Sequence, residues 1–371
     1  MSRLHVALLG LAVAAACASD AGPAPTDVGP PDAAAGLRVV QADRALYAAF
    51  PTEVQLLSQP GLPTDASGLI GRNRSWGAMY AARFQMGTGS ALRGVLAAGR
   101  ADDIARAFRG IEAGLATIEP SGRLPATVPV SVSMGATPSE ADVASGAAFF
   151  LGDACTAVLA LEQTVTTGAA IEAARRRRVR EQLVSAARWL RTTSAALAAA
   201  DARAPNRLLF DARAFEACGA LAGDQVLRDE SRWFVSAAIA SLRADDAFDE
   251  GGGWDTNYQA VAIDIGLDVL TVLPATSARD SLASTLSRAT RWLTARVGPD
   301  GRVNSAGNRR TCAGGESFLG EPKRLSLSSV IAALAKSSVT DGTAPVDVAA
   351  AARRVSSWAQ AQPTADPCFE W

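Results

Sequence analysis

Residues 249–258, with the sequence DEGGGWDTNY, hold an unusual density of side chains able to do chemistry. Three consecutive glycines allow the backbone to turn tightly, and carboxylates and phenols can transfer protons as general acids and bases. The side chains that would share one rim are Asp249, Trp254, Asp255, Asn257 and Tyr258. The competing interpretation is structural: Asp255 or Thr256 caps a helix that begins here, and Trp254 packs under the loop.

A second stretch, residues 304–316 (NSAGNRRTCAGGE), is rich in cations and glycine and is followed by Lys323. Arg309, Arg310 and Lys323 together could clamp a carboxylate of a ligand, because guanidinium groups bind carboxylates through paired donors. Glu316 would supply a second catalytic carboxylate. The alternative is a loop held by a disulfide, whose charges pair with the acidic residues of the first stretch.

Histidine chemistry is excluded from the exported part of the chain. The only histidine is His5, inside a segment with the features of an export leader. A Ser-His-Asp triad, a Cys-His dyad and a histidine-bearing zinc site are therefore ruled out. Proton transfer would have to rely on carboxylates or on one of three tyrosines, Tyr47, Tyr80 and Tyr258.

The N-terminal segment predicts export. A short basic start is followed by an apolar run that ends at residue 16 and is too short for a bilayer, which needs roughly 20 residues. Three alanines before Cys17 resemble the lipobox of bacterial lipoproteins, which implies a signal peptide over 1–16, lipidation of Cys17 and, with Ala18, an outer-membrane lipoprotein on the periplasmic or cell-surface side. An ordinary signal peptide cut near Ala16 or Ala18 is the alternative.

The residues after Cys17 predict a spacer. Residues 18–36 contain four prolines and almost no large apolar side chain, so they cannot bury enough surface to fold. We expect a flexible linker over 17–44 and one folded domain over 45–371. The lipid anchor would make the membrane a partner of this domain.

Charge and cysteine content limit which partners and cofactors are expected. With 36 basic and 37 acidic residues the chain has no excess of positive charge, so no nucleic acid partner is expected. An even set of cysteines in an exported chain predicts two disulfides, with three pairings open. No CxxC spacing or nucleotide-binding motif is present, so we expect no metal and no cofactor. The cysteines are Cys155, Cys218, Cys312 and Cys368.

Two kinds of helical segment alternate along the chain. Segments such as 277–297 carry apolar residues at helical spacing on one face, whereas segments such as 143–161 and 258–273 are apolar nearly all round and must be buried on both sides. Within the latter, Asp264 and Asp268 either line a central axis or hydrogen-bond to neighbouring inner helices. The long links 119–138, 243–254 and 298–322 all precede buried segments, which places them on one face.

This alternation resembles the (α/α) toroid of six-hairpin glycosidases and polysaccharide lyases, an all-α fold in which those same loops form the active-site funnel. A sixth hairpin is not evident, and residues 37–60 could close the ring. The resemblance also implies the pairs Cys155–Cys218, in successive inner helices, and Cys312–Cys368, in a funnel loop and the tail. The five hairpins are 70–97 with 101–118, 139–166 with 171–199, 206–222 with 224–242, 254–273 with 277–297, and 323–338 with 345–362.

The resemblance implies a polysaccharide or oligosaccharide as the ligand. Trp254 would stack on a sugar, and Asp255 would act with Glu316 as acid and base. Asn257 and Tyr258 would hold or protonate the substrate. Hydrolysis is expected ahead of lyase chemistry, because the resemblance implies that toroid lyases use Asn, His, Tyr and Arg, and the histidine is missing here. Trp76 and Tyr80, which repeat the spacing of Trp254 and Tyr258, would form another part of the funnel wall. The competing class is a toroid that binds or scaffolds glycans without catalysis.

Overall fold

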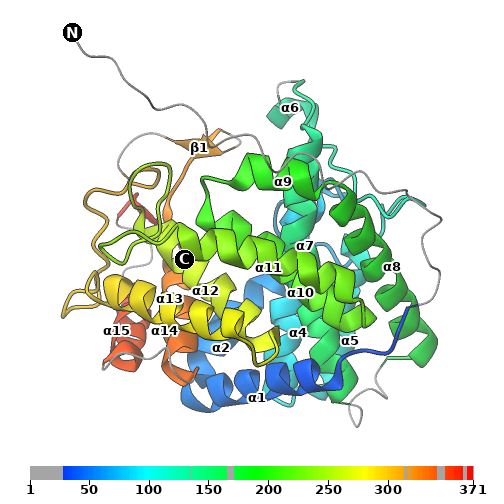
Figure 1. Ribbon diagram of the computed structural model, residues 1–371, viewed down its shortest axis with the longest axis horizontal. Helices are drawn as coiled ribbons and strands as arrows, with labels where there is room; N and C mark the ends of the chain where they lie inside the picture. Colours follow the sequence, from blue (N-terminus) through cyan, green and yellow to red (C-terminus); the bar gives the residue numbers. More distant parts are fainter. Residues whose placement is uncertain are drawn as a thin grey trace.

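The fold is seen in the computed structural model of Figure 1, which describes residues 28–133, 135–164, 171–312, 316–318, 320–340, 347–361 and 366–370. Helices form nearly all of its regular structure, and the strands among these residues are two residues long. The predicted all-α class is therefore confirmed. The predicted signal peptide and Cys17 lie outside the described residues.

Five pairs of consecutive helices follow the predicted hairpins closely. The first helices of the pairs contact one another in chain order, and each also contacts the second helix of its own pair. The pairs are α4 (Thr88–Ala97) with α5 (Ala101–Gly114), α7 (Glu140–Gln163) with α8 (Ala173–Thr192), α10 (Pro205–Ala222) with α11 (Gln225–Ala240), α12 (Thr256–Val272) with α13 (Ser277–Thr294), and α14 (Leu327–Val339) with α15 (Val348–Ala361).

The first helices of the pairs form the core. In α7 every residue from Val143 to Leu161 is buried, and α10 is buried from Leu208 to Ala222. By length and composition α7 could cross a membrane, but its apolar window is entirely buried inside the domain. The second helices, such as α8 and α13, each keep one face in water. The alternation of buried and amphipathic segments in the sequence is thus an alternation of inner and outer helices.

The first predicted hairpin differs from the structure in its inner part. Residues 70–97 form not one helix but α3 (Gly71–Trp76), a 3₁₀ turn η2 (Ala82–Gln85) and α4. Gly77 ends α3 and Gly87 precedes α4, both with left-handed backbone (φ 77° and 105°). That conformation favours glycine and interrupts a right-handed helix.

The predicted linker is too long at its C-terminal end. Helix α1 (Ala33–Ala49) begins inside the span assigned to the linker, and Asp32 caps it by accepting a hydrogen bond from the Ala35 amide at 3.0 Å. Val39 is fully buried, and α1 contacts α4, α7, α12 and α14. Figure 1 shows α1 along the bottom, at the end opposite β1 and α6. The prolines that indicated a spacer end at Pro31, and the apolar residues that follow them, such as Val39 and Val40, pack into the core.

The smaller elements lie between the hairpins and at the C-terminus. Two antiparallel strands precede α14, and the C-terminal strand pairs in parallel with the residues that lead into α14. Figure 1 places β1 near the top of the view, at the same end as α6. These elements are α2 (Pro51–Ser58), η1 (Gln59–Gly61), α6 (Val130–Ser133), α9 (Ser194–Asp201), β1 (Ser317–Phe318), β2 (Glu321–Pro322), β3 (Leu325–Ser326) and β4 (Phe369–Glu370).

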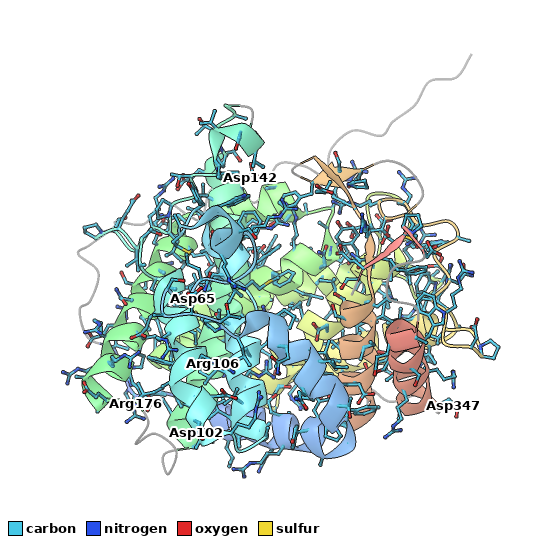
Figure 2. All side chains as sticks on the ribbon, turned by 180° about the vertical axis from the view of Figure 1, so that it is seen from behind. Asp65, Asp102, Arg106, Asp142, Arg176 and Asp347 are labelled. Atoms are coloured by element: carbon cyan, nitrogen blue, oxygen red, sulfur yellow. A yellow bond between two sulfur atoms is a disulfide. The ribbon has the colours of Figure 1, made fainter. Side chains whose placement is uncertain are left out.

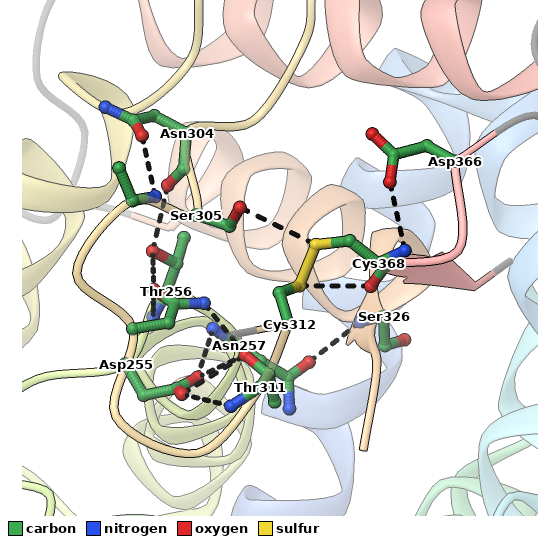
Figure 3. Close-up of a disulfide and its surroundings, with 12 residues drawn as sticks. Asp255, Thr256, Asn257, Asn304, Ser305, Thr311, Cys312, Ser326, Asp366 and Cys368 are labelled. Atoms are coloured by element: carbon green, nitrogen blue, oxygen red, sulfur yellow. Dashed lines mark hydrogen bonds between the residues drawn. A yellow bond between two sulfur atoms is a disulfide. The ribbon is translucent and has the colours of Figure 1, made fainter. Parts of the chain in front are cut away.

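Both expected disulfides are present. Cys155 of α7 and Cys218 of α10 are joined with their Cα atoms 5.1 Å apart, and both are fully buried. Cys312 and Cys368 are joined with Cα atoms 4.6 Å apart. The second bond ties the C-terminal strand to the loop before α14, as Figure 3 shows. The cysteine pairing is therefore confirmed.

A neutral cluster of six charged side chains, three of them buried, lies where the inner helices meet α1. Asp268 of α12 is 2% exposed and accepts hydrogen bonds from Arg93 at 3.0 Å, Arg213 at 2.8 Å and Lys336 at 2.9 Å. Despite its burial, these cations hold the pKa of Asp268 well below its usual value. Bonding to neighbouring inner helices is thus the role of Asp268. The other members are Asp43, which pairs with Arg93, and Asp264, which pairs with Lys336.

A second buried carboxyl pair lies between α9 and α10. Asp201 and Asp211 are both fully buried, and Asp201 pairs with Arg207 at 3.0 Å. Neither oxygen of Asp211 finds a donor among the described residues. Burial, together with the negative charge of Asp201, raises the pKa of Asp211 far above its usual value. The uncharged form of Asp211 is therefore favoured in the folded protein.

This pair makes stability depend on pH with a definite sign. Because the pKa of Asp211 is raised on folding, its contribution to stability is fully present below the unfolded pKa of about 3.9 and is lost as the pH rises through the folded value. Between the unfolded and the folded pKa of Asp211, the free energy of unfolding of Asp211→Asn should rise relative to that of the wild type by up to about 1.4 kcal/mol per pH unit. Urea unfolding at several pH values measures this. Asp229→Asn, at an exposed position, is the control, and parallel pH profiles for wild type and Asp211→Asn would show that folding does not raise the pKa of Asp211.

Candidate functional site

The two chemically rich stretches meet at the N-terminal ends of α12 and α14. The Arg309 amide donates to the Trp254 carbonyl at 3.2 Å, and the Arg310 guanidinium bonds the carboxylate of Glu250. The Ser326 amide, at the start of α14, donates to the Asn257 side chain at 2.9 Å. The long loops before the two helices are therefore one structural unit.

Asp255 is the N-cap of α12, and both of its oxygens are occupied. One oxygen accepts from the amides of Asn257 at 3.0 Å and Tyr258 at 3.3 Å. The other accepts from the amides of Arg310 at 2.9 Å and Thr311 at 2.8 Å. The residue is 1% exposed. Figure 3 shows the carboxylate enclosed by the loop. The structural interpretation of Asp255 therefore describes the geometry, and the expected role as an open acid or base does not.

A polar network beside Asp255 holds the loop in place. The side-chain oxygen of Asn308 accepts from the amide and hydroxyl of Thr256 at 3.0 and 2.8 Å, and its amide donates to Thr311 at 2.8 Å. The Thr311 hydroxyl donates in turn to Asp255. Asn308 and Thr311 are buried and were not singled out from the sequence. Their only signal was their place in a loop rich in small polar residues.

Trp254 packs under a loop and is not an open sugar platform. The Arg296 guanidinium lies 3.8 Å from its ring centroid, and Trp292 meets it edge to face at 5.3 Å. A side chain at Gly307 would collide with the indole, since a Cβ there would lie 2.5 Å from it. The expected stacking face is thus covered by protein. The glycine is required because the loop crosses directly over the ring.

A polar pocket of about 260 Å³ opens beside this unit. Arg310 lines it: the guanidinium bonds Glu250 and Glu316 and lies 4.2 Å from the ring centroid of Tyr258. Lys323 also pairs with Glu316. The pocket is lined by Arg203, Glu250, Gly251, Arg309, Arg310 and Glu316. Of the predicted site residues, Arg309, Arg310 and Glu316 therefore line one pocket, with Tyr258 beneath.

The two carboxylates of the pocket differ in their electrostatics. Burial raises the pKa of Glu250 to about 7, although the Arg310 charge opposes this shift. Burial of Glu316 is slight, and hydrogen bonds from Lys323 and Arg310 lower its pKa. Glu250 was not among the residues chosen from the sequence, where only its place beside Asp249 pointed to it. At neutral pH Glu250 is the group of this pocket best placed to exchange a proton.

Two arginines of the pocket are exposed and unpaired. Arg310 and Lys323 are neutralised by Glu250 and Glu316, but Arg203 and Arg309 have no ion pair among the residues that the structure describes. The side chain of Arg309 lies across Gly253, where an added Cβ would come within 2.4 Å of it. The pocket therefore presents two cations to a ligand. Arg203 was missed in the sequence because its position at the end of α9 gives no local signal.

The remaining predicted residues lie outside this pocket. Asp249 accepts from the Gly252 amide at 3.1 Å and faces Arg243. Trp76 and Tyr80 meet edge to face at 5.5 Å, in a cluster where Trp76 also contacts Phe84. The ring centroids of Phe84 and Phe318 of β1 lie 6.3 Å apart, so this cluster contacts the long segment between α13 and α14. Trp76 and Tyr80 thus belong to a neighbouring wall of the same end of the molecule.

No group of three or more His, Cys, Asp or Glu side chains in the described part of the chain could hold a metal ion. Comparisons with protein-family models, with curated proteins and with solved structures found no match to this chain.

Proposed function

We propose that this chain binds an acidic polysaccharide or oligosaccharide without cleaving it, in the pocket lined by Arg203, Glu250, Arg309, Arg310 and Glu316. The observation that carries the proposal is the pair of unpaired guanidinium groups, Arg203 and Arg309, on a pocket whose other cations are neutralised. Paired donors of a guanidinium match the carboxylate of a uronic acid. The Tyr258 ring, 4.2 Å from the Arg310 guanidinium, supports this arginine from outside the pocket lining.

Binding without catalysis is favoured by the state of the two expected carboxylates. Asp255 is buried and used entirely as a cap, and Glu316 is ion-paired on both sides. A hydrolytic pair requires two carboxyl groups facing a bound sugar from opposite sides. Asp255 has no free oxygen for that role.

The test measures binding by affinity electrophoresis in gels that contain polygalacturonate, an acidic polymer, or dextran, a neutral one. We expect retardation by polygalacturonate only, and a loss of affinity of about tenfold or more in the double variant Arg203→Gln, Arg309→Gln, because hydrogen bonds to charged groups are lost. Arg177→Gln, an exposed arginine of α8, is the matched control. Equal retardation by dextran, or unchanged affinity of the double variant, would show that the two cations do not bind the glycan.

A second candidate function, glycoside hydrolysis with Glu250 as general acid, is favoured by the pKa of about 7 for this group. Lyase chemistry with Tyr258 as base and acid is its variant. Following reducing ends and the ultraviolet absorbance of an unsaturated product on the same polymers separates the two reactions. Release of product by the wild type but not by Glu250→Gln would replace the binding proposal with catalysis.

We further propose that the hairpins form an (α/α) toroid tethered to the outer membrane through lipidated Cys17. The succession of contacts α4, α7, α10, α12, α14 supports a ring, and α2 contacts both α14 and α4, where a ring would close. Two disulfides are consistent with export into an oxidising compartment. Metabolic labelling with a palmitate analogue, lost on Cys17→Ala, tests the anchor.

A further inference from the structure

A second cavity, of about 430 Å³, lies between η2, the start of α7, the 124–138 segment and β1. Its walls are mainly apolar, and its volume is within the range of cavities that hold small organic ligands. Representative lining residues are Phe84, Leu124, Val128, Val132, Val143 and Phe318. The polar pocket that we assign to saccharide shares none of its lining residues with this cavity.

One cation, Arg83, lines this cavity. Its guanidinium lies between two aromatic rings, 4.9 Å from the centroid of Phe149 and 4.7 Å from that of Phe318. Among the described residues, no carboxylate lies within ion-pair distance of Arg83 and no acceptor hydrogen-bonds it. Burial, reinforced by the like charge of Arg207, lowers the pKa of Arg83 to about 10.

The two arginines that are buried among the described residues, Arg93 and Arg213, both pair with carboxylates, whereas the half-buried Arg83 lies against aromatic rings without one, as does Arg296. Arg93 lies 2.7 Å from a carboxylate oxygen, Arg213 lies 2.8 Å from one, and Arg228 lies 2.8 Å from one. A desolvated cation without a counter-ion is costly, so buried charges are normally paired. Arg83 therefore lacks a counter-ion, and the cavity beside it has room for a ligand that carries one.

The other charged residue of the cavity restricts the anion. Asp142 is exposed at the rim, where it accepts from the amide and hydroxyl of Ser139 in the capping box of α7. Figure 2 shows Asp142 near the end of the molecule that carries α6. A ligand with a second negative charge at the opening would be repelled by this carboxylate. A single anionic group, held inside, matches the arrangement.

We propose that this cavity binds a molecule with an apolar body and one terminal carboxylate, with the carboxylate on Arg83 and the body against Phe84, Phe318 and the aliphatic wall. The planar guanidinium offers two parallel donors to a carboxylate, and the aromatic rings on either side hold it in place. An aliphatic chain and an aromatic ring are both suitable bodies. The site is independent of the proposed saccharide pocket.

The test is calorimetric titration of the purified chain with octanoate and 4-phenylbutyrate, and with octan-1-ol and 4-phenylbutan-1-ol as their neutral equivalents. We expect at least one acid to bind about tenfold or more tightly than its neutral equivalent, which is the value of a charge-assisted hydrogen bond. Whichever acid binds identifies the body as aliphatic or aromatic. Arg83→Met should lower the affinity for that acid by about tenfold or more, and Arg83→Lys by less, since lysine keeps the charge without the paired donors.

Two further variants keep the result interpretable if Arg83→Met is poorly folded. Gly146 lines the cavity, and an added Cβ would lie 3.4 Å from the Cβ of Arg83, so Gly146→Leu should fill the space and weaken binding while Arg83 remains. Arg72→Met removes an arginine that faces the Phe318 ring at 5.8 Å but does not line the cavity, and should leave binding unchanged. Equal affinity for acid and alcohol, no binding of either acid, or unchanged binding in Arg83→Met would each overturn the proposal.

Discussion

Replacing Asp268 with alanine should lower the free energy of unfolding by about 3–5 kcal/mol, the usual cost of removing one partner from a buried ion pair. Asp268 is the common acceptor of Arg93, Arg213 and Lys336, which come from three inner helices. Its removal leaves Arg213 buried without a carboxylate partner among the described residues. Urea unfolding followed by circular dichroism gives the difference directly.

Asp264 provides the matched comparison for this prediction. It lies one helical turn away on α12 and pairs only with Lys336, while its side chain is 21% exposed. Asp264→Ala leaves Lys336 bonded to Asp268, so we expect a loss of about 1 kcal/mol or less. Equal effects of the two substitutions would mean that the charged cluster does not stabilise the contact between inner helices.

Replacing Asp255 with alanine should lower the free energy of unfolding by about 3 kcal/mol or more. The substitution leaves the amides of Asn257, Arg310 and Thr311 without their acceptor in a buried site, and each buried donor without a partner costs about 1–3 kcal/mol. It also releases the loop that holds Arg310, so we expect the affinity for polygalacturonate to fall together with the stability. Thermal unfolding and affinity electrophoresis on the same variant measure both effects.

This result separates a structural Asp255 from a catalytic one. A catalytic carboxylate at an open site can be changed with little loss of stability, whereas a buried cap cannot. Glu316→Gln is the comparison, since Glu316 is 45% exposed and its ion pairs should contribute less than about 1 kcal/mol. An Asp255→Ala variant as stable as the wild type would restore the catalytic interpretation.

The helical hairpins were the most predictable part of this fold. Segments such as 254–273 and 277–297 were recognised from the periodicity of their apolar residues, and the helices found are Thr256–Val272 and Ser277–Thr294. The spacing of apolar side chains along a helix indicates whether one face or all faces are buried. The resemblance to a toroid made the helices that carry Cys155 and Cys218 neighbours, and the pairing that it implied is the one found.

Several features of the candidate site did not follow from local sequence. An aspartate before a helix can be an open acid or a cap, and only the approach of Arg310 and Thr311, more than fifty residues later, made Asp255 a buried cap. Trp254 was covered by Gly307 of the same distant loop and by Arg296, which follows α13. The raised pKa of Glu250 likewise depends on its burial.

The order of inner and outer helices, the even set of cysteines after Cys17 and the absence of histidine after residue 5 were all present in the linear sequence, because composition and helical periodicity are local properties. The tertiary structure alone decided which charges are neutralised. Asp268 meets cations from three other helices, Arg310 lies between two carboxylates, and Arg83 lies between two aromatic rings. Ionic pairing and burial depend on contacts between segments far apart in the chain, so the reactive residues of this protein are set by its folding rather than by its motifs.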